Sequence, residues 1–288
     1  MNRKGINPGG RIALVAGEGE LPCHLVRAGR EAGVDLVVYG IDGLCAQSLE
    51  TDHIFGLGEV GKLKRQLAAD NVEKIAFSGR FYRPDYGSVA WDAGAIAVLP
   101  QILKTKVGGD DNVSRVISDV FSSSWGFEIV GPSDIAPHFV SRAGVLSDKR
   151  PSRAQLRDIA TGIEAIAGLG KYDIGQALVV HDQRVIAVEA AEGTDQMVSR
   201  VGLLREQGRL RAKPPSGVLV KAAKPNQEMR IDMPVVGVET VRVAAAAGLA
   251  GIAVAAGQVL LVTPEDVCAE ANRNGLFVVG IDSGAGNS

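Results

Sequence analysis

Three carboxylates gather in one short segment of the second half of the chain. Residues 189–195 read Glu-Ala-Ala-Glu-Gly-Thr-Asp, so Glu189, Glu192 and Asp195 surround a glycine turn. Carboxylate oxygens are ligands that Mg²⁺ prefers, usually one or two of them together with phosphate oxygens. A capped helix start would explain Thr194 and Asp195, but not Glu189 and Glu192. We therefore expect these three carboxylates to be metal-ligand candidates.

Residues 221–234 (KAAKPNQEMRIDMP) form the densest polar segment. The cations Lys221, Lys224 and Arg230 share it with Asp232. Lysine and arginine can hold a diphosphate, and a carboxylate can hold a metal ion or position water. A solvated charged loop is the alternative, but the two prolines restrict the backbone in a way that such a loop does not require. We expect a phosphate site here.

A glycine-rich turn, Gly17-Glu18-Gly19, follows the first predicted strand and precedes a predicted helix. Glycines allow the backbone to approach a phosphate or sugar, and a helix N-terminus offers N–H groups. The third glycine of the dinucleotide-binding fingerprint is replaced by Pro22, which disfavours a nicotinamide site. The alternatives are a nucleotide-contacting loop and a simple tight turn.

Two further loops of the first half contain candidate binding residues. Residues 78–84 (SGRFYRP) follow a predicted parallel strand, so Gly79 and Arg80 lie where such sheets bind ligands. Arg80 could pair with a phosphate or stack on a base. Asp110 and Asp111 follow two glycines and precede a predicted helix, where a cap would explain only one acid. For the first loop the alternative is an ordinary charged loop, and for the second it is a helix N-cap.

The elements that must position these residues alternate between strand and helix in the first 130 residues. This alternation predicts parallel βαβ units and a Rossmann-like domain. The predicted strands are 11–16, 35–39, 54–57, 74–78 and 127–130, and the predicted helices are 21–32, 60–69, 89–103 and 113–122.

The second half predicts a mixed α/β arrangement. Residues 176–180 and 184–189 are expected to pair as a hairpin across His181-Asp-Gln. The other predicted strands are 217–221, 251–255, 258–262 and 276–280, and the helices are 152–167, 194–207, 238–247 and 264–274. We expect an N-terminal Rossmann-like domain over 1–137, a linker over 138–151 and a C-terminal α/β domain over 152–288.

Composition excludes several classes of protein. With 31 basic and 33 acidic residues, the net charge of −2 disfavours a nucleic-acid binder. The three cysteines and four isolated histidines have no zinc or disulfide spacing. Residues 243–264 carry no charge and match the length of a membrane span, but glycines divide them into helix-sized and strand-sized pieces. No secretory signal pattern is present, and we expect a cytoplasmic protein.

Six segments resemble the LpxI family of UDP-2,3-diacylglucosamine pyrophosphatases of lipid A biosynthesis. The resemblance extends over residues 11–281, with Met233 and Val235 standing where Leu and Thr are expected. It implies Mg²⁺-dependent hydrolysis to UMP and 2,3-diacylglucosamine 1-phosphate (lipid X), by water attack on the pyrophosphate. The segments are 12–22 (IALVAGEGELP), 78–84 (SGRFYRP), 108–116 (GGDDNVSRV), 172–195 (YDIGQALVVHDQRVIAVEAAEGTD), 219–240 (LVKAAKPNQEMRIDMPVVGVET) and 245–255 (AAAGLAGIAVA).

The resemblance also implies roles for individual residues. The essential aspartate of the family falls on Asp232, as catalytic residue and metal ligand or water-positioning group, with Glu189, Glu192 and Asp195 as further metal ligands. Lys221, Lys224 and Arg230 would bind phosphate. The nucleotide or remaining substrate would contact Gly17, Glu18, Gly19, Gly79, Arg80, Asp110, Asp111, Gln176, Thr194 and Gln227.

Two other functions remain alternatives at this point. One is a non-catalytic UDP-sugar or lipid-binding module, and the other is a nicotinamide-dependent oxidoreductase. The expected partners are UDP-2,3-diacylglucosamine and lipid X, with a peripheral contact to the inner membrane and no nucleic acid.

Overall fold

The computed structural model describes residues 10–81, 89–103, 118–225 and 227–282. The chain divides into two compact units. The first contains Met1–Pro137 and Arg230–Asp232, and the second contains His138–Met229 and Met233–Ser288. Arg230–Asp232 comes from the second half of the sequence, but Ile231 packs against the apolar core of the first unit.

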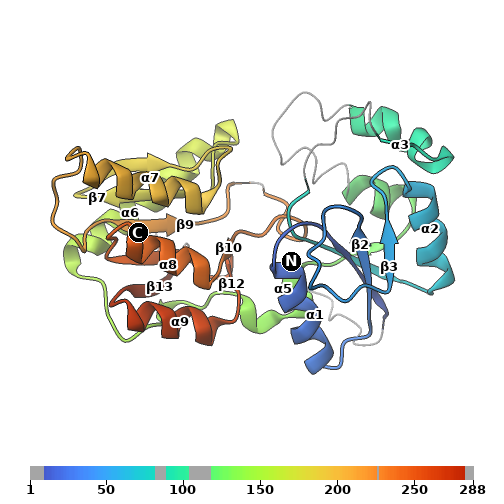
Figure 1. The fold of residues 1–288 in the computed structure, drawn as a ribbon, viewed down its shortest axis with the longest axis horizontal. Coiled ribbons are helices and arrows are strands. Elements are labelled where there is room, and N and C mark those ends of the chain that lie inside the picture. The colour runs from blue at the N-terminus through green and yellow to red at the C-terminus, as the bar shows by residue number, and fades with distance from the viewer. Residues whose placement is uncertain (1–9, 82–88, 104–117, 226, 283–288) are drawn as a thin grey trace. The chain divides into compact units, whose positions relative to one another are not determined.

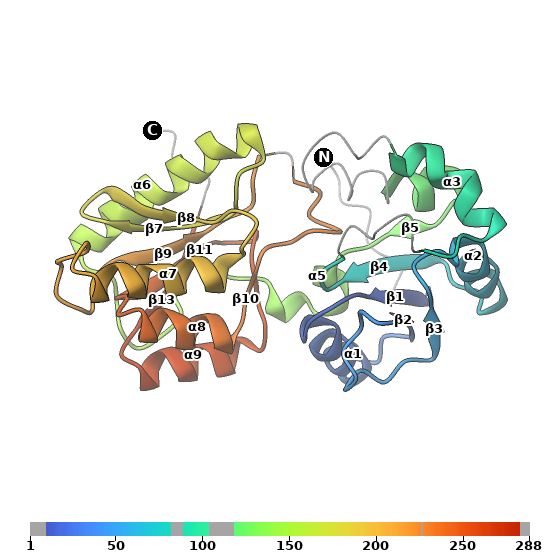
Figure 2. The same ribbon diagram turned by 45° about the horizontal axis from the view of Figure 1, so that its top comes forward.

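The first unit, drawn in Figure 1, is built on a five-stranded parallel sheet with the order β3-β2-β1-β4-β5; all five strands are labelled in Figure 2. The strands are β1 (Ile12–Ala16), β2 (Leu36–Ile41), β3 (His53–Phe55), β4 (Lys74–Ser78) and β5 (Glu128–Ile129). From β1 the chain adds β2 and β3 on one side and then β4 and β5 on the other. The carboxyl ends of β1 and β4 therefore form the topological switch point, where open α/β sheets bind ligands. The predicted Rossmann-like sheet is confirmed.

The helices of this unit are α1 (Leu21–Glu31), α2 (Val60–Ala69), α3 (Ala93–Leu103) and the short α5 (Pro132–Ile135). One carboxylate caps two of them. Asp92 Oδ1 accepts hydrogen bonds from Ala95 N (2.7 Å) and Gly61 N (3.0 Å), and its Oδ2 accepts one from Lys62 N (2.9 Å). These contacts join the N-termini of α2 and α3 through a single side chain. Residues 113–117 of the predicted helix 113–122 lie outside the described residues, and a π-helical turn occupies Val120–Ser124.

The second unit contains a six-stranded mixed sheet with the order β6-β13-β11-β9-β7-β8. Strands β9, β11 and β13 are parallel, whereas β7 runs antiparallel to both β8 and β9. Two further short strands, which form a parallel pair, are β10 (Val235–Val236) and β12 (Leu260–Leu261). The sheet strands are β6 (Gly144–Val145), β7 (Ala177–His181), β8 (Arg184–Val188), β9 (Val218–Lys221), β11 (Gly251–Ala255) and β13 (Phe277–Ile281).

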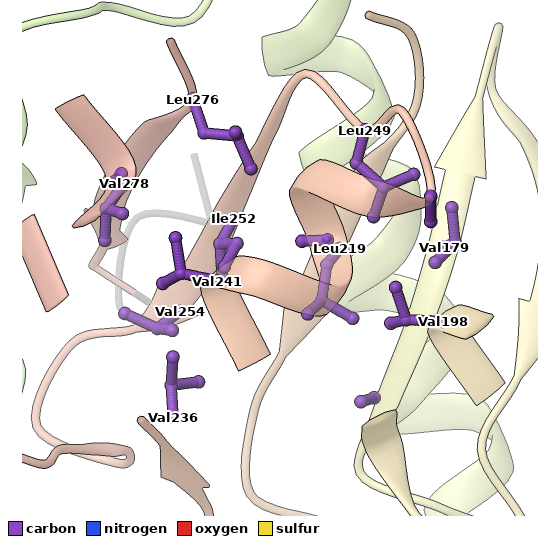
Figure 3. Packing of buried hydrophobic residues seen from close by; sticks show 14 of the residues in the cluster. Val179, Val198, Leu219, Val236, Val241, Leu249, Ile252, Val254, Leu276 and Val278 are labelled. Atoms are coloured by element: carbon purple, nitrogen blue, oxygen red, sulfur yellow. The ribbon is translucent and has the colours of Figure 1, made fainter. Parts of the chain in front are cut away.

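Helices cover both faces of this sheet (Figure 2). Helix α6 (Arg153–Leu169) packs on one face, and α7 (Thr194–Glu206), α8 (Val238–Ala246) and α9 (Pro264–Arg273) pack on the other. Successive side chains of a strand point to opposite faces of the sheet, so each face has its own apolar core. Leu219 packs with Val179 and Ile252 on the face covered by α7, α8 and α9 (Figure 3), whereas Val220 packs on the face covered by α6. The mixed α/β class predicted for the second half is confirmed.

Residues 138–151, expected as a linker, are attached to the sheet of the second unit. They supply β6, which pairs antiparallel with β13. Ser141 Oγ donates a hydrogen bond to Ala255 O (3.1 Å), and Leu146 N donates one to Val278 O (2.9 Å). The segment therefore contributes to one compact unit along much of its length.

The uncharged run 243–264 folds into the end of α8, then β11 and β12. Across the part of the chain that the structure describes, no helix has both the length and the apolar character needed to cross a membrane.

Candidate functional site

The candidate site of the second unit forms where β9 ends. Lys221 is the last residue of β9 and pairs with Ala177, the first residue of the antiparallel strand β7. Gln176 precedes β7, and its carbonyl accepts a hydrogen bond from Ala222 N (3.0 Å). Because β8 is antiparallel to β7, its end lies at the same edge, and Glu189 N donates to Ala177 O (2.9 Å). The strand order thus brings residues 176, 189 and 221 together.

A buried hydrogen-bond chain links a cation to a carboxylate at this edge. Lys221 Nζ donates to Thr194 Oγ1 (2.6 Å), and Thr194 Oγ1 donates to Glu189 Oε1 (2.6 Å). Glu189 Oε2 accepts a hydrogen bond from Gln176 N (3.0 Å). The three residues whose side chains form these bonds are buried: Lys221 is 5% exposed, Thr194 is 9% exposed and Glu189 is 6% exposed. Buried charged groups require hydrogen-bond partners of this kind. These hydrogen bonds hold the ammonium group of Lys221 in a defined place.

A second buried cation adjoins the first. Lys224 Nζ forms an ion pair with Asp173 Oδ1, and Lys224 N donates to Gln227 Oε1 (2.8 Å). Gln227 Nε2 in turn donates to Gln176 Oε1 (3.1 Å). Gln176 therefore connects the two lysines through its backbone and its side chain.

Six residues predicted from the sequence are thus brought into one hydrogen-bonded cluster. We call this group the lysine cluster; it consists of Gln176, Glu189, Thr194, Lys221, Lys224 and Gln227. Asp173 belongs beside it and was missed by sequence reasoning. Its only local signal is a short polar turn, in which it adopts a left-handed backbone conformation (φ 57°). Nothing in that turn indicates its partner, which lies 51 residues later.

The carboxylates of residues 189–195 do not converge. Glu192 accepts hydrogen bonds from Arg200 (2.8 Å) and from Ala190 N (3.2 Å). Asp195 Oδ1 accepts a hydrogen bond from Thr240 Oγ1 on α8 (2.9 Å). Among the residues with described placement, no group of three or more His, Cys, Asp or Glu side chains is arranged to hold a metal ion. At the start of α7, Thr194 bonds Glu189, whereas the next residue, Asp195, is bonded to Thr240 on α8.

Asp232 and Arg230, the other two candidates of the segment 221–234, belong to the first unit. A Cβ atom added at Gly131 would lie 3.2 Å from Arg230 Cα, so this backbone passes close to the loop between β5 and α5. The absence of a side chain at residue 131 permits that approach.

The glycine-rich turn and the loop after β4 meet at the topological switch point of the first unit. Gly17 N donates to Ser78 O (2.8 Å). Glu18 and Arg80 exchange backbone hydrogen bonds of 3.0 and 2.9 Å, and their side chains form an ion pair (Nε to Oε2, 3.5 Å). This exposed pair contributes at most about 1 kcal/mol, so an anionic ligand could replace Glu18 as the partner of Arg80.

Two glycines are required for this meeting of loops. A Cβ atom at Gly17 would lie 2.5 Å from Arg80 O. Gly79 has a φ of 92°, and its Cβ atom would lie 2.7 Å from Glu18 O. Gly19 then leads into α1 with a φ of 103°. The predicted residues 17–19, 79 and 80 are therefore neighbours, while Asp110 and Asp111 lie outside the described residues.

Comparison with known proteins identifies the family. The model of the LpxI N-terminal domain matches residues 11–139, and that of the LpxI C-terminal domain matches residues 142–279. A curated relative, the UDP-2,3-diacylglucosamine pyrophosphatase LpxI of Caulobacter vibrioides, is 39% identical over 274 residues, covering 94% of this chain and 98% of the relative. A glycinamide-RNase-transformylase T structure from Mycobacterium tuberculosis is 13% identical, and the match covers 63% of this chain and 44% of that one. Its TM-score of 0.21 is too low to indicate a shared fold. Two matched domains and a relative of nearly equal length show that this chain belongs to the LpxI family.

Proposed function

We propose that this chain hydrolyses UDP-2,3-diacylglucosamine to UMP and 2,3-diacylglucosamine 1-phosphate. The observation that carries the proposal is the 39% identity, over 94% of the chain, to a curated protein named for its action on that substrate. The lysine cluster supports it independently, because buried cations are the groups that a diphosphate needs.

The lysine cluster would bind the diphosphate. Phosphoryl transfer is catalysed mainly by positioning and by stabilisation of charge on the phosphate oxygens. Lys221 and Lys224 are both at least nine-tenths buried, and charges act more strongly in such surroundings than in water. Thr194 and Glu189 would keep Lys221 in place while the substrate changes its charge distribution.

Asp232 would be the catalytic carboxylate. The assignment rests on the resemblance of the segment 219–240 to the family, whose essential aspartate falls on Asp232. In the proposed reaction a water oxygen forms a bond to the sugar-side phosphorus, and the phosphoanhydride bond to the UMP oxygen breaks. A carboxylate can position this water or accept its proton.

Mg²⁺ fits the donors that this chain offers. The ion is usually held by one or two carboxylates and by substrate phosphates, not by an all-protein cage. We propose that Asp232 supplies the protein ligand. When bound, the ion would neutralise charge on the diphosphate. Glu189 has both oxygens in hydrogen bonds to Thr194 and Gln176, which favours a structural role for it.

The switch point of the first unit would receive the uridine end of the substrate. The backbone of residues 17–19 and 79 approaches closely there, and Arg80 offers a guanidinium group to a phosphate or a base.

The direct test measures UMP released from UDP-2,3-diacylglucosamine dispersed in detergent, with Mg²⁺ and with a chelator. We expect Mg²⁺-dependent release and, in ¹⁸O-water, label in the lipid product; label only in UMP would reject the attack site. Asp232→Asn should lower turnover by orders of magnitude while substrate still binds. The matched control is Asp195→Asn, since Asp195 is bonded to Thr240. Substrate binding without UMP release by the unaltered chain would indicate a binding module, and a thermal shift with NAD(P) instead of UMP would indicate an oxidoreductase.

A further inference from the structure

The turn that follows α6 carries an acid, Asp173, that reaches the lysine cluster. A single 3₁₀ turn covers Gly170–Tyr172, and Asp173 ends it with a left-handed backbone conformation (φ 57°). Its neighbours Tyr172 and Ile174 are 76% and 39% exposed. The carboxylate of Asp173, in contrast, forms an ion pair with Lys224 Nζ. The turn therefore sends one acidic side chain toward a buried cation while the residues beside it face solvent.

The backbone of this turn is fixed from two sides. A Cβ atom at Gly170 would lie 2.5 Å from the ring of Pro225, the residue after Lys224. Gly175 has a φ of 55°, and its Cβ atom would lie 2.2 Å from Glu189 O. The missing side chains permit both close approaches. The turn is thus packed between the segments that supply the two ends of the lysine cluster.

The ion pair of Asp173 is largely removed from water. The side chain of Lys224 is 8% exposed and that of Asp173 is 23% exposed. Apolar side chains of similar volume often stabilise a fold as well as a buried ion pair does, so stability alone is a weak reason for this pair. Removal of one partner, however, leaves a buried charge uncompensated. The carboxylate therefore determines whether the ammonium group can remain where it is.

A carboxylate on a lysine could hold the ammonium group for a phosphate, or it could compete with the phosphate for it. A competitor has to move aside when the phosphate arrives, and the close packing at Gly170 and Gly175 opposes such a movement. An ammonium group has three N–H donors, so Lys224 can donate to Asp173 and to a phosphate oxygen at the same time. The geometry therefore favours holding over competition.

We propose that Asp173 is a positioning residue for diphosphate hydrolysis, which acts by holding the ammonium group of Lys224 in the lysine cluster. The inference rests on the proposed function, to which it adds a residue that does not itself touch the substrate. Donors that are already in place when charge develops on the phosphate oxygens stabilise the transition state without a cost of reorganisation. Without its carboxylate, Lys224 would have to be ordered by the substrate.

The first test is Asp173→Asn, which keeps the size of the side chain and removes its charge. Asparagine adopts the left-handed conformation readily, so the turn should persist. We expect kcat/KM for detergent-dispersed UDP-2,3-diacylglucosamine to fall about 100-fold. In calorimetric titration, the affinity for inorganic pyrophosphate should fall about ten-fold, because one charge-assisted contact is no longer held in place.

Asp182 provides a matched control in the same unit. It too has a left-handed conformation (φ 49°), and its carboxylate lies 3.5 Å from His181 Nε2. It follows His181, the last residue of β7, and so lies at the opposite end of that strand from Ala177, which pairs with Lys221. Asp182→Asn should change hydrolysis and pyrophosphate binding less than about two-fold, as expected for a surface substitution.

Chemical rescue separates positioning from a merely structural role. Asp173→Gly suits the left-handed backbone and leaves room for a small carboxylate beside Lys224. Formate should raise kcat/KM of this variant at least about five-fold over chloride at the same ionic strength, because a carboxylate returns to the ammonium group. Asp182→Gly should not respond to formate. Thermal unfolding of each variant establishes that it is folded.

The two readouts distinguish this proposal from the proposed function. If the unaltered chain bound pyrophosphate but did not hydrolyse UDP-2,3-diacylglucosamine, and Asp173→Asn weakened that binding, the proposed function would be rejected and the positioning role would stand. Hydrolysis by Asp173→Asn at the rate of the unaltered chain would overturn the positioning role. Tighter pyrophosphate binding by Asp173→Asn would overturn it too, by showing that the carboxylate competes with phosphate. So would a folded Asp173→Gly variant that loses activity and regains none with formate.

Discussion

The hydroxyl group of Thr194 offers the sharpest test of the lysine cluster. It accepts a hydrogen bond from Lys221 and donates one to Glu189, both of 2.6 Å, and the residue is buried. Thr194→Val keeps the shape of the side chain but removes both bonds. A buried ammonium group and a buried carboxylate would each lose a partner.

The magnitude follows from these two bonds. Hydrogen bonds to charged groups contribute about 1.5–3 kcal/mol each, and loss of a partner for a buried group is costly. Two bonds in series place Lys221 Nζ and Glu189 Oε1 no more than about 5 Å apart, so the groups can relax toward each other. We therefore expect a net loss of about 3 kcal/mol in the free energy of unfolding. For a unit of about 150 residues this corresponds to a fall in melting temperature of about 6–12 °C.

The assays are calorimetric unfolding and steady-state hydrolysis. Thr194→Ser keeps the hydroxyl group and should restore most of both properties. Thr240→Val is the matched control, because it removes a similarly buried hydroxyl group that bonds Asp195 outside the cluster. With Lys221 no longer positioned, Thr194→Val should lower kcat/KM about 100-fold, a loss of about 2.7 kcal/mol of transition-state stabilisation.

A double-mutant cycle with Lys221→Met closes the test. If the hydroxyl group and the ammonium group act together, the sum of the stability losses of the two single variants should exceed the loss of the double variant by at least about 1 kcal/mol. Additive losses, or a Thr194→Val variant as stable and active as Thr240→Val, would refute the cluster as a functional unit.

Three further changes test other parts of the structure. Gly17→Ala should weaken UMP binding at least about ten-fold, measured by calorimetric titration, because the added methyl group forces the switch-point loops apart. The control is Gly33, which has a φ of 72° and open space around it. Gly33→Ala should cost about 1–2 kcal/mol of stability and leave UMP binding unchanged. Burial acts to raise the pKa of Asp92, but the backbone hydrogen bonds from Ala95, Gly61 and Lys62 lower it below the ordinary aspartate value. Its stabilisation is therefore present above that ordinary pKa and is lost as pH falls through the lower folded-state pKa. Urea midpoints should drop as the pH falls below about 5, and they should drop less steeply in Asp92→Asn. Burial lowers the pKa of Arg205, whose guanidinium group bonds the carbonyls of residues 212, 216, 247 and 248. Arg205→Met should cost about 3 kcal/mol or more, seen as a lower melting temperature, because these carbonyl groups lose their donor; an unchanged melting temperature would contradict that role.

The amino-acid pattern predicts the classes of element and points to many residues of the candidate site. Apolar runs such as residues 12–16, alternating with helical patterns, predicted the parallel sheet of the first unit, because burial on both faces requires continuous apolar strands. The glycine-rich turn at residues 17–19 predicted a close approach of the backbone to a phosphate or sugar. In the structure, Gly17 and Gly79 also allow the close approach of their own two loops. Lys221 and Lys224 are predicted as phosphate ligands because their segment is the densest polar segment of the sequence.

Long-range packing of the folded chain sets which of these residues meet. Gln176 reaches Lys221 through the antiparallel pairing of β7 with β9, and Asp173 reaches Lys224 across 51 residues. Asp195 is bonded to Thr240 on α8, Glu189 to Thr194 and Gln176, and Glu192 to Arg200, so carboxylates that are close along the chain have different partners. Ile231 packs into the core of the first unit, and Arg230–Asp232 therefore belongs there although its neighbours in sequence do not. The periodicity of a segment reports only which face it buries, whereas strand order and side-chain partners depend on the packing of the whole chain.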